Sequence, residues 1–291
     1  MTHTLLATAV AFVMAACATT PTGDRPEAAV PQPTLPVTDP SAPMMQVSLP
    51  IDDGSVDGIV VLSWAIDDNG SVIDAFFTAH PPADIAATSV AAMRRNGLAL
   101  ATTTLVELPK VLRALGGTSI TVSSWLGQAT QQTQIAARNL DHSTACVIDG
   151  GSRRLDAGAL QLLLRGWTVP LEVGAVTDIE VVPVHTPGGS IPGARRTASE
   201  SFPSAGFFAA MARGSVLLIT SATPRQSSAS TRGPTAGPPV SLPPTLGEML
   251  LGRPTDQSLA SARRPMLVVI PLISGAHFAA ANPIDSSTPS P

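Results

Sequence analysis

The first segment with a clear pattern of apolar residues begins at residue 58. Segment Gly58–Phe77 contains the runs GIVVLSWAI and SVIDAFF, which are separated by Asp67-Asp68-Asn69-Gly70. Asn-Gly between two β-branched and aromatic runs is a strong hairpin signal, because both residues of the turn must take φ > 0. The pattern therefore predicts two antiparallel strands over residues 58–77.

Two segments further along have helical spacing, and each precedes a strand-like run. Ala83–Asn96 is rich in alanine and is followed by Gly97, a residue that commonly ends helices. A second helix is predicted by apolar residues at i, i+3, i+4 and i+7, namely Leu108, Val111, Leu112 and Leu115. Leu98–Thr103 and Thr118–Ser124 are predicted strands. These elements together predict a small α+β domain over residues 51–127.

The pattern becomes β-rich in residues 128–278. Ala159–Trp167 and Ala175–Val184 are predicted to form a hairpin, and Thr144–Asp149 another strand. Phe207–Ala212 and Ser215–Ala222 flank a tight connection at Arg213-Gly214. The last strand is Pro265–Ile273, where Pro271 is compatible with a sheet edge.

Period-two spacing within Ala159–Trp167 separates two faces of that strand. Leu160, Leu162 and Leu164 lie on one face, which we expect to pack into the core. The other face is mixed and carries Gln161, Leu163, Arg165 and Trp167.

Proline-rich segments interrupt these patterns. Residues 17–50 contain eight prolines and read as an extended tether, and residues 223–244 contain six and read as a flexible insertion. Residues 279–291 read as a disordered tail. The fold class is therefore α+β, with a small N-terminal α+β domain, a β-rich domain, a Pro-rich tether and a Pro-rich loop.

The N-terminus predicts export. Leu5–Ala16 is a short apolar stretch that ends in small residues, as in a signal peptide spanning residues 1–16. Met14-Ala15-Ala16-Cys17 resembles the lipobox of bacterial lipoproteins, a resemblance that implies cleavage before Cys17 and its acylation, for example with palmitate. Ala18 in place of Asp implies anchoring at the periplasmic face of the outer membrane. The alternative is an ordinary cleaved signal and a secreted or periplasmic protein.

The chain has two cysteines, so acylation of Cys17 would leave Cys146 alone. The apolar neighbours of Cys146, Val147 and Ile148 among them, favour burial in a strand. A reactive thiol is the alternative at this position. A bridge between Cys17 and Cys146 would contradict the lipid anchor.

Candidate chemistry is sparse. A net charge of −4 and a pI near 5.7 argue against a nucleic-acid partner. The five histidines show no metal-ligand spacing, and no nucleotide-binding or nucleophile-elbow motif occurs. Asp141-His142-Ser143 holds triad residue types, but successive strand residues point apart. We therefore assign no catalytic residue, cofactor or metal, and lipidation at Cys17 is the single predicted site.

One further resemblance lies near the C-terminus. Pro244–Leu251 precedes the hydrophobic run Leu267–Ile273, and this order resembles the end of the secretin family over about residues 144–273. The resemblance implies a component of an envelope secretion complex. The sequence thus predicts a non-enzymatic, lipid-anchored envelope protein that acts by binding or assembly, with the membrane and an envelope protein as partners. The alternative is a periplasmic hydrolase that acts on an envelope polymer.

Overall fold

The structure is a computed structural model that describes residues 56–117, 119–172, 174–188, 198–223, 242–252 and 263–279. All these residues belong to one compact unit, Met44–Pro291. Strands predominate over short helices, and the predicted α+β class is confirmed. The expected signal peptide and tether, and most of the expected insertion and C-terminal tail, lie outside the described residues.

Sheet A is antiparallel and has the strand order β2-β11-β12-β1-β3. Its strands are β1 (Gly58–Asp67), β2 (Leu98–Thr104), β3 (Ser119–Gly127), β11 (Ser215–Ser221) and β12 (Arg263–Leu272). Because β11 and β12 come from the second half of the chain, this sheet joins segments that are far apart in sequence.

Sheet B is also antiparallel, with the order β10-β8-β7-β4 and a short β9 beside β8. Its strands are β4 (Ala129–Leu140), β7 (Gly158–Pro170), β8 (Ala175–Pro187), β9 (Glu200–Ser201) and β10 (Phe207–Ala212). Strands β5 (Thr144–Ile148) and β6 (Gly151–Leu155) form a separate hairpin. The predicted β7–β8 hairpin is confirmed, with Gly158–Pro170 paired in unbroken register to Ala175–Pro187.

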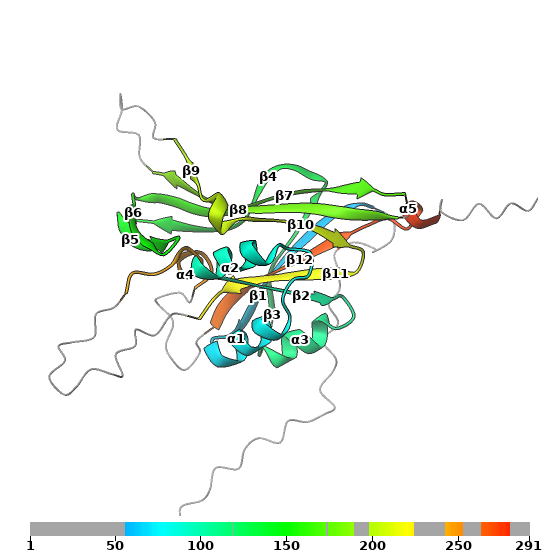
Figure 1. The fold of residues 1–291 in the computed structure, drawn as a ribbon, viewed down its shortest axis with the longest axis horizontal. Coiled ribbons are helices and arrows are strands. Elements are labelled where there is room, and N and C mark those ends of the chain that lie inside the picture. The colour runs from blue at the N-terminus through cyan, green and yellow to red at the C-terminus, as the bar shows by residue number, and fades with distance from the viewer. Residues whose placement is uncertain are drawn as a thin grey trace, which may run out of the picture. The chain divides into compact units, whose positions relative to one another are not determined.

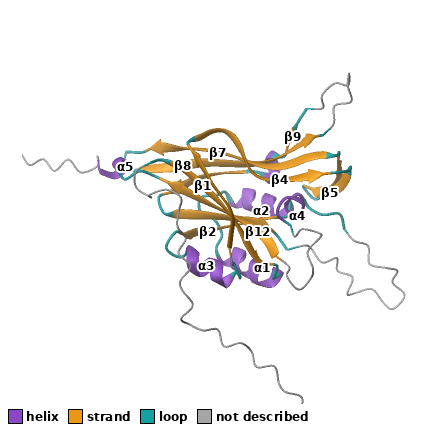
Figure 2. Ribbon diagram, turned by 180° about the vertical axis from the view of Figure 1, so that it is seen from behind, coloured by secondary structure: helices purple, strands orange, loops and turns teal. Residues whose placement is uncertain are grey.

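Helices cover one face of sheet A and fill one end of the space between the sheets (Figures 1 and 2). The helices on sheet A are α1 (Gly70–Ala79) and α3 (Leu108–Ala114), and those between the sheets are α2 (Ala87–Arg95) and α4 (Leu246–Leu251). A short helix, α5 (Ala276–Ala279), lies at the end of β7 and β8, and a 3-10 turn lies at Pro203–Ala205. The predicted helix at residues 108–115 is confirmed. The one predicted at Ala83–Asn96 begins later, at Ala87.

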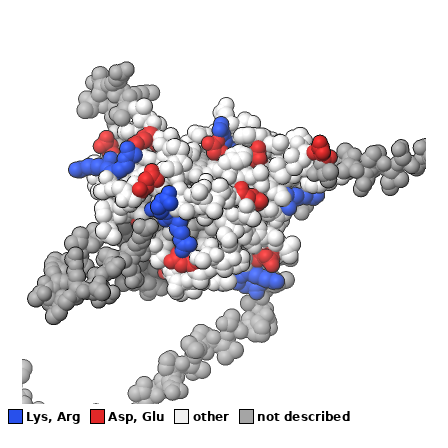
Figure 3. Space-filling view, viewed as in Figure 1, with Lys and Arg blue, Asp and Glu red and all other residues white. Residues whose placement is uncertain are grey.

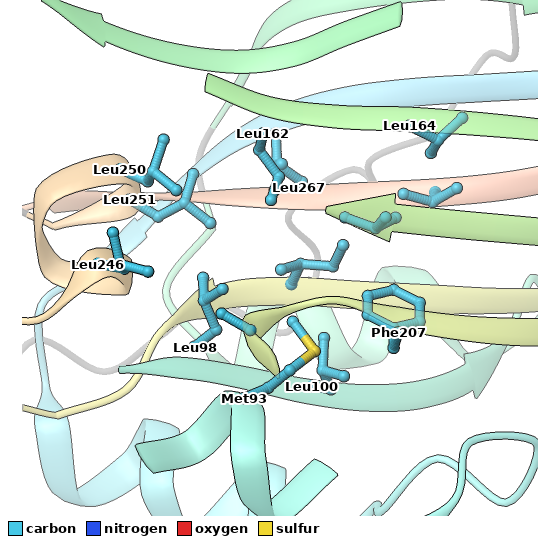
Figure 4. Close-up of a cluster of buried hydrophobic side chains, with 14 of the residues drawn as sticks. Met93, Leu98, Leu100, Leu162, Leu164, Phe207, Leu246, Leu250, Leu251 and Leu267 are labelled. Carbon is cyan, nitrogen blue, oxygen red and sulfur yellow. The ribbon is translucent and has the colours of Figure 1, made fainter. Parts of the chain in front are cut away.

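Two apolar cores result from this layering. One lies between sheet A and helices α1 and α3 and contains the buried Trp64. The other lies between the two sheets, where α2 and α4 also contribute side chains (Figure 4). Leu160, Leu162 and Leu164 are fully buried in this second core, so the predicted core face of β7 is confirmed.

The predicted hairpin over residues 58–77 is wrong. Only its first half is a strand, and Gly70–Ala79 forms α1. Asn69 caps this helix, because its side-chain oxygen accepts a hydrogen bond from the Val72 amide at 3.4 Å. Ile73 and Phe77, spaced i and i+4, are both buried against sheet A. Asn is favoured at N-caps as well as in turns, and burial of this helical face decides between them.

The chain passes from sheet A to sheet B at the predicted boundary between residues 127 and 128, but two later strands, β11 and β12, return to sheet A. β1 lies between β3 and β12, so strands from both expected domains share sheet A. The expected edge position of the last strand is likewise wrong, because β12 is central. Its pairing with β11 covers Met266–Val269, which lies between Pro265 and Pro271. A central strand tolerates these prolines because the ladder to β11 is short.

The tight connection at Arg213-Gly214 joins the two sheets rather than forming a hairpin. β10 pairs with β8 in sheet B, whereas β11 pairs with β2 and β12 in sheet A. Gly214 has φ of 79°, which lets the chain turn sharply here.

Candidate functional site

The outer face of sheet B carries the exposed Phe208 beside the half-buried Trp167 and the ion pair between Arg165 and Glu180. Alternation along β7 buries Leu160, Leu162 and Leu164 and turns Arg165 and Trp167 outward. Helices α1 and α3 lie on sheet A, α2 and α4 lie between the sheets, and α5 lies at the end of β7 and β8 (Figures 1 and 2). Of the described helices, none packs on this outer face in either view.

The centre of this face is a row of three residues from neighbouring strands. Arg165 on β7 lies opposite Glu180 on β8, which in turn lies opposite Phe208 on β10. Arg165 donates through Nε to Glu180 Oε2. The two side chains remain 44% and 33% exposed, so the pair contributes little to stability, at most about 1 kcal/mol. Phe208 is 52% exposed.

A second row lies two residues further along the strands. Trp167 on β7 faces Asp178 on β8, which faces Ala210 on β10. The Arg165 guanidinium lies 5.9 Å from the Trp167 ring centroid, within the range of a cation–π contact. We call Arg165, Trp167, Asp178, Glu180 and Phe208 the aromatic–ionic patch.

The chemistry of this patch suits recognition of another macromolecule. Trp, Phe and Arg are enriched at protein interfaces, and Trp and Arg often dominate their binding energy. The carboxylates of Asp178 and Glu180 can accept hydrogen bonds from a partner, and the Arg165 guanidinium can donate them. In the printed sequence the outward face of β7 is readable from its alternation, but Phe208 and Glu180 join it only through strand pairing.

The structure places the residues considered in the sequence apart from this patch. Cys17 lies outside the described residues. Cys146 is buried in β5, as expected, and burial raises the pKa of its thiol to about 11. Asp141 and His142 are exposed, and Ser143 donates to the backbone oxygen of Leu155.

Tertiary structure brings together a different Ser, His and Asp set, whose members are too far apart in the chain to be connected by any motif. Asp57 Oδ1 accepts the Ser274 amide at 2.7 Å, and Asp57 Oδ2 lies 2.8 Å from His277 Nε2. Ser274 Oγ accepts the Ala276 amide at 3.2 Å. The hydroxyl thus serves a turn, and the arrangement fastens α5 to the start of β1.

A second carboxylate is held by neutral partners. Asp149, in the β5–β6 turn with φ of 53°, accepts hydrogen bonds from the side chains of Asn96 at 2.9 Å and Ser204 at 2.7 Å. These hydrogen bonds lower the pKa of Asp149. Its amide donates back to Asn96 Oδ1 at 2.8 Å, so the group ties the turn to the end of α2.

An open groove of about 720 Å³ runs along the start of α2. Its lining is mostly apolar, with Pro81, Pro82 and Ile85, and it includes Asp84 as a single carboxylate. Arg94 at its end lies 3.6 Å from Asp74 of α1. Hydrolysis of a polymer such as a glycan commonly uses two carboxylates that converge on the scissile bond, and this lining holds one. Across the described ranges, no cluster of three His, Cys, Asp or Glu could hold a metal ion.

No helix in the described part of the chain is both long and apolar enough to cross a membrane. Comparison of the chain with protein-family models, with curated proteins and with solved structures found no match in any of the three.

Proposed function

We propose that this chain is a lipid-anchored protein of the cell envelope that acts by binding a protein partner through the outer face of sheet B. The observation that carries the binding role is the aromatic–ionic patch, in which Arg165 and Glu180 lie beside exposed Phe208. The anchor rests on the resemblance of residues 14–17 to a lipobox.

The energetics of the patch support recognition over a purely structural role. The Arg165–Glu180 pair is solvent-accessible and adds little to folding stability. Burial of the exposed Phe208 ring under a partner would remove apolar surface from water, and this transfer favours binding. On the face of the molecule that Figure 3 draws, charged side chains are few and scattered, in keeping with 13% charged residues in the chain.

The partner class follows from the compartment and from the second resemblance. Residues 144–273 resemble the end of the secretin family, so an envelope secretion complex is the partner we propose. In the structure these residues include β7, β8 and β10, the strands that carry the aromatic–ionic patch. The anchor would hold this face within reach of the periplasmic side of the outer membrane.

Photo-cross-linking in cells tests the binding role. A photoreactive phenylalanine analogue replaces Phe208 in the full chain, and a matched control replaces Val106, which is 85% exposed in the turn before α3. A discrete adduct with an envelope protein is expected from position 208 and not from position 106. Arg165→Glu should abolish that adduct, whereas Arg113→Glu on α3 should leave it. Equal labelling from both positions, or none from position 208, contradicts the proposal.

A further inference from the structure

Asp178 is the charged side chain of the aromatic–ionic patch that has no partner among the described residues. Arg165 and Glu180 pair with each other, whereas no hydrogen bond or ion pair joins the Asp178 carboxylate to another described residue. Asp178 is half-buried, on a strand that is paired on both sides. The patch therefore has two carboxylates and one guanidinium, so that one negative charge is not compensated.

Strand pairing places Asp178 between an aromatic ring and a small side chain. Trp167 lies opposite Asp178 on β7, and Ala210 lies opposite it on β10. Residues opposite one another on antiparallel strands have Cβ atoms about 4.5–5.5 Å apart, so the carboxylate and the indole are neighbours on one face. Ala210 is exposed and has no side-chain atom beyond Cβ to cover the carboxylate.

A carboxylate beside an indole suits a guanidinium or an ammonium group. The carboxylate accepts charge-assisted hydrogen bonds, and the face of the indole attracts a cation through its quadrupole. The first row of the patch already holds such a cation, because the Arg165 guanidinium pairs with Glu180 and lies 5.9 Å from the Trp167 ring centroid. Asp178 offers the same chemistry in the second row, where the cation is left for a partner to supply.

We propose that the partner of the outer face of sheet B presents an arginine or lysine to Asp178 and an apolar side chain to Phe208. This inference rests on the proposed function and names the chemistry of the partner. Phe208 is diagonal to Asp178 across the β8–β10 pair and is 52% exposed. Diagonal neighbours of this kind are about 7–8 Å apart, so both contacts fit within one short segment of the partner.

Charge decides between this partner and the other occupants of an open sheet face. A second copy of this chain would bring two uncompensated carboxylates into one interface, and anionic lipid headgroups would add further negative charge. A basic segment neutralises Asp178 instead. Arg165→Glu is still expected to prevent binding, because a carboxylate at this position repels Glu180 and no cation then lies against the Trp167 ring.

Photo-cross-linking from position 208 in cells, combined with changes at Asp178, tests this inference. The full chain with the photoreactive analogue in place of Phe208 is compared with the same chain carrying Asp178→Lys, Asp178→Asn or Asp178→Glu. Asp141→Lys is the matched control, because Asp141 is an exposed aspartate just beyond the end of β4. Asp178→Lys should lower the yield of the protein adduct about tenfold or more, because a like charge repels the basic segment. Asp178→Asn should lower it less, and Asp178→Glu and Asp141→Lys should leave it unchanged.

Mass spectrometry of the adduct then identifies the partner segment at the cross-link. An arginine or lysine beside the linked position is expected. Its replacement by glutamate should abolish the adduct with the unchanged chain and restore it with Asp178→Lys. If Asp178→Lys alters the circular dichroism, Asp178→Asn and the replacement in the partner decide.

The failure of this inference differs from the failure of the proposed function. A protein adduct that survives Asp178→Lys, or a linked segment without a basic residue, overturns the inference and leaves the binding role standing. An adduct with lipid or with a second copy of this chain also overturns the inference. The absence of any adduct from position 208 of the unchanged chain contradicts the proposed function, and this inference with it.

Discussion

Asp57 and His277 are 220 residues apart in the sequence and form a pair 2.8 Å long between Oδ2 and Nε2. The pair joins the residue before β1 to the last described helix. The next residue, Phe278, packs its ring against Gly174 in the β7–β8 connection. The packing is so close that a Cβ atom on Gly174 would lie 2.4 Å from the ring. The two ends of the described body are therefore fastened at one place.

Asp57→Asn should make the protein less stable at neutral pH and flatten its acid denaturation. Burial alone would raise the pKa of Asp57, but hydrogen bonds from His277 and Ser274 outweigh it and lower the pKa. A carboxyl with a lowered folded-state pKa contributes stability above its unfolded value, near 4, and loses it as pH falls through the folded value. Urea midpoints between pH 3 and 7 should therefore converge for the two proteins at low pH. A constant difference between them would contradict the assignment.

Leu162→Ala should cost about 2–5 kcal/mol of unfolding free energy, since Leu162 is fully buried between the sheets. Arg165→Ala, three residues further along β7, should cost less than about 1 kcal/mol because its ion pair is exposed. Denaturant unfolding of both variants measures the ranking. The reverse ranking would mean that the faces of β7 are assigned the wrong way round.

Asn69→Ala should destabilise the protein by about 0.5–2 kcal/mol, because it removes the side-chain oxygen that caps α1. Asn69→Ser keeps a capping oxygen and should cost much less. Thermal unfolding of the two variants separates a lost cap from a general effect of substitution. Equal losses for Ala and Ser would argue against the capping role.

Cys17→Ala should stop incorporation of labelled fatty acid and release the protein from the outer-membrane fraction, if the resemblance to a lipobox is functional. Cys146→Ala serves as the matched control and should keep both the label and the membrane association, because Cys146 is buried in β5 and lies outside the lipobox-like residues 14–17. Continued labelling of the Cys17→Ala protein would contradict the lipoprotein hypothesis.

Cys146 should resist alkylation in the folded protein. Burial raises its pKa to about 11, so at pH 8 the group is both a thiol and inaccessible. In the Cys17→Ala protein, where it is the remaining cysteine, iodoacetamide should label it in urea but not in native buffer. Rapid labelling of Cys146 in native buffer would instead support a reactive thiol at this position.

Local pattern determined the elements that are set by neighbouring residues. Period-two spacing found the buried face of β7, and helical spacing found α3, because in both cases side chains close in sequence share one face. The same pattern could not decide at Asn69, where turn and cap chemistry are alike. Only burial of Ile73 and Phe77 against sheet A makes that segment a helix.

Tertiary structure alone decided which strands share a sheet. β12 pairs with β1, which lies some 200 residues earlier in the chain, and no local spacing of residues predicts this pairing. Because of it, strands from both domains expected from the sequence belong to one sheet. The aromatic–ionic patch arises in the same way, because Arg165, Glu180 and Phe208 meet only after three strands align. The sequence by itself predicted an export signal in residues 1–16 and the outward face of β7, but only the fold placed that face beside Glu180 and Phe208, because strand pairing joins residues that are far apart in the chain.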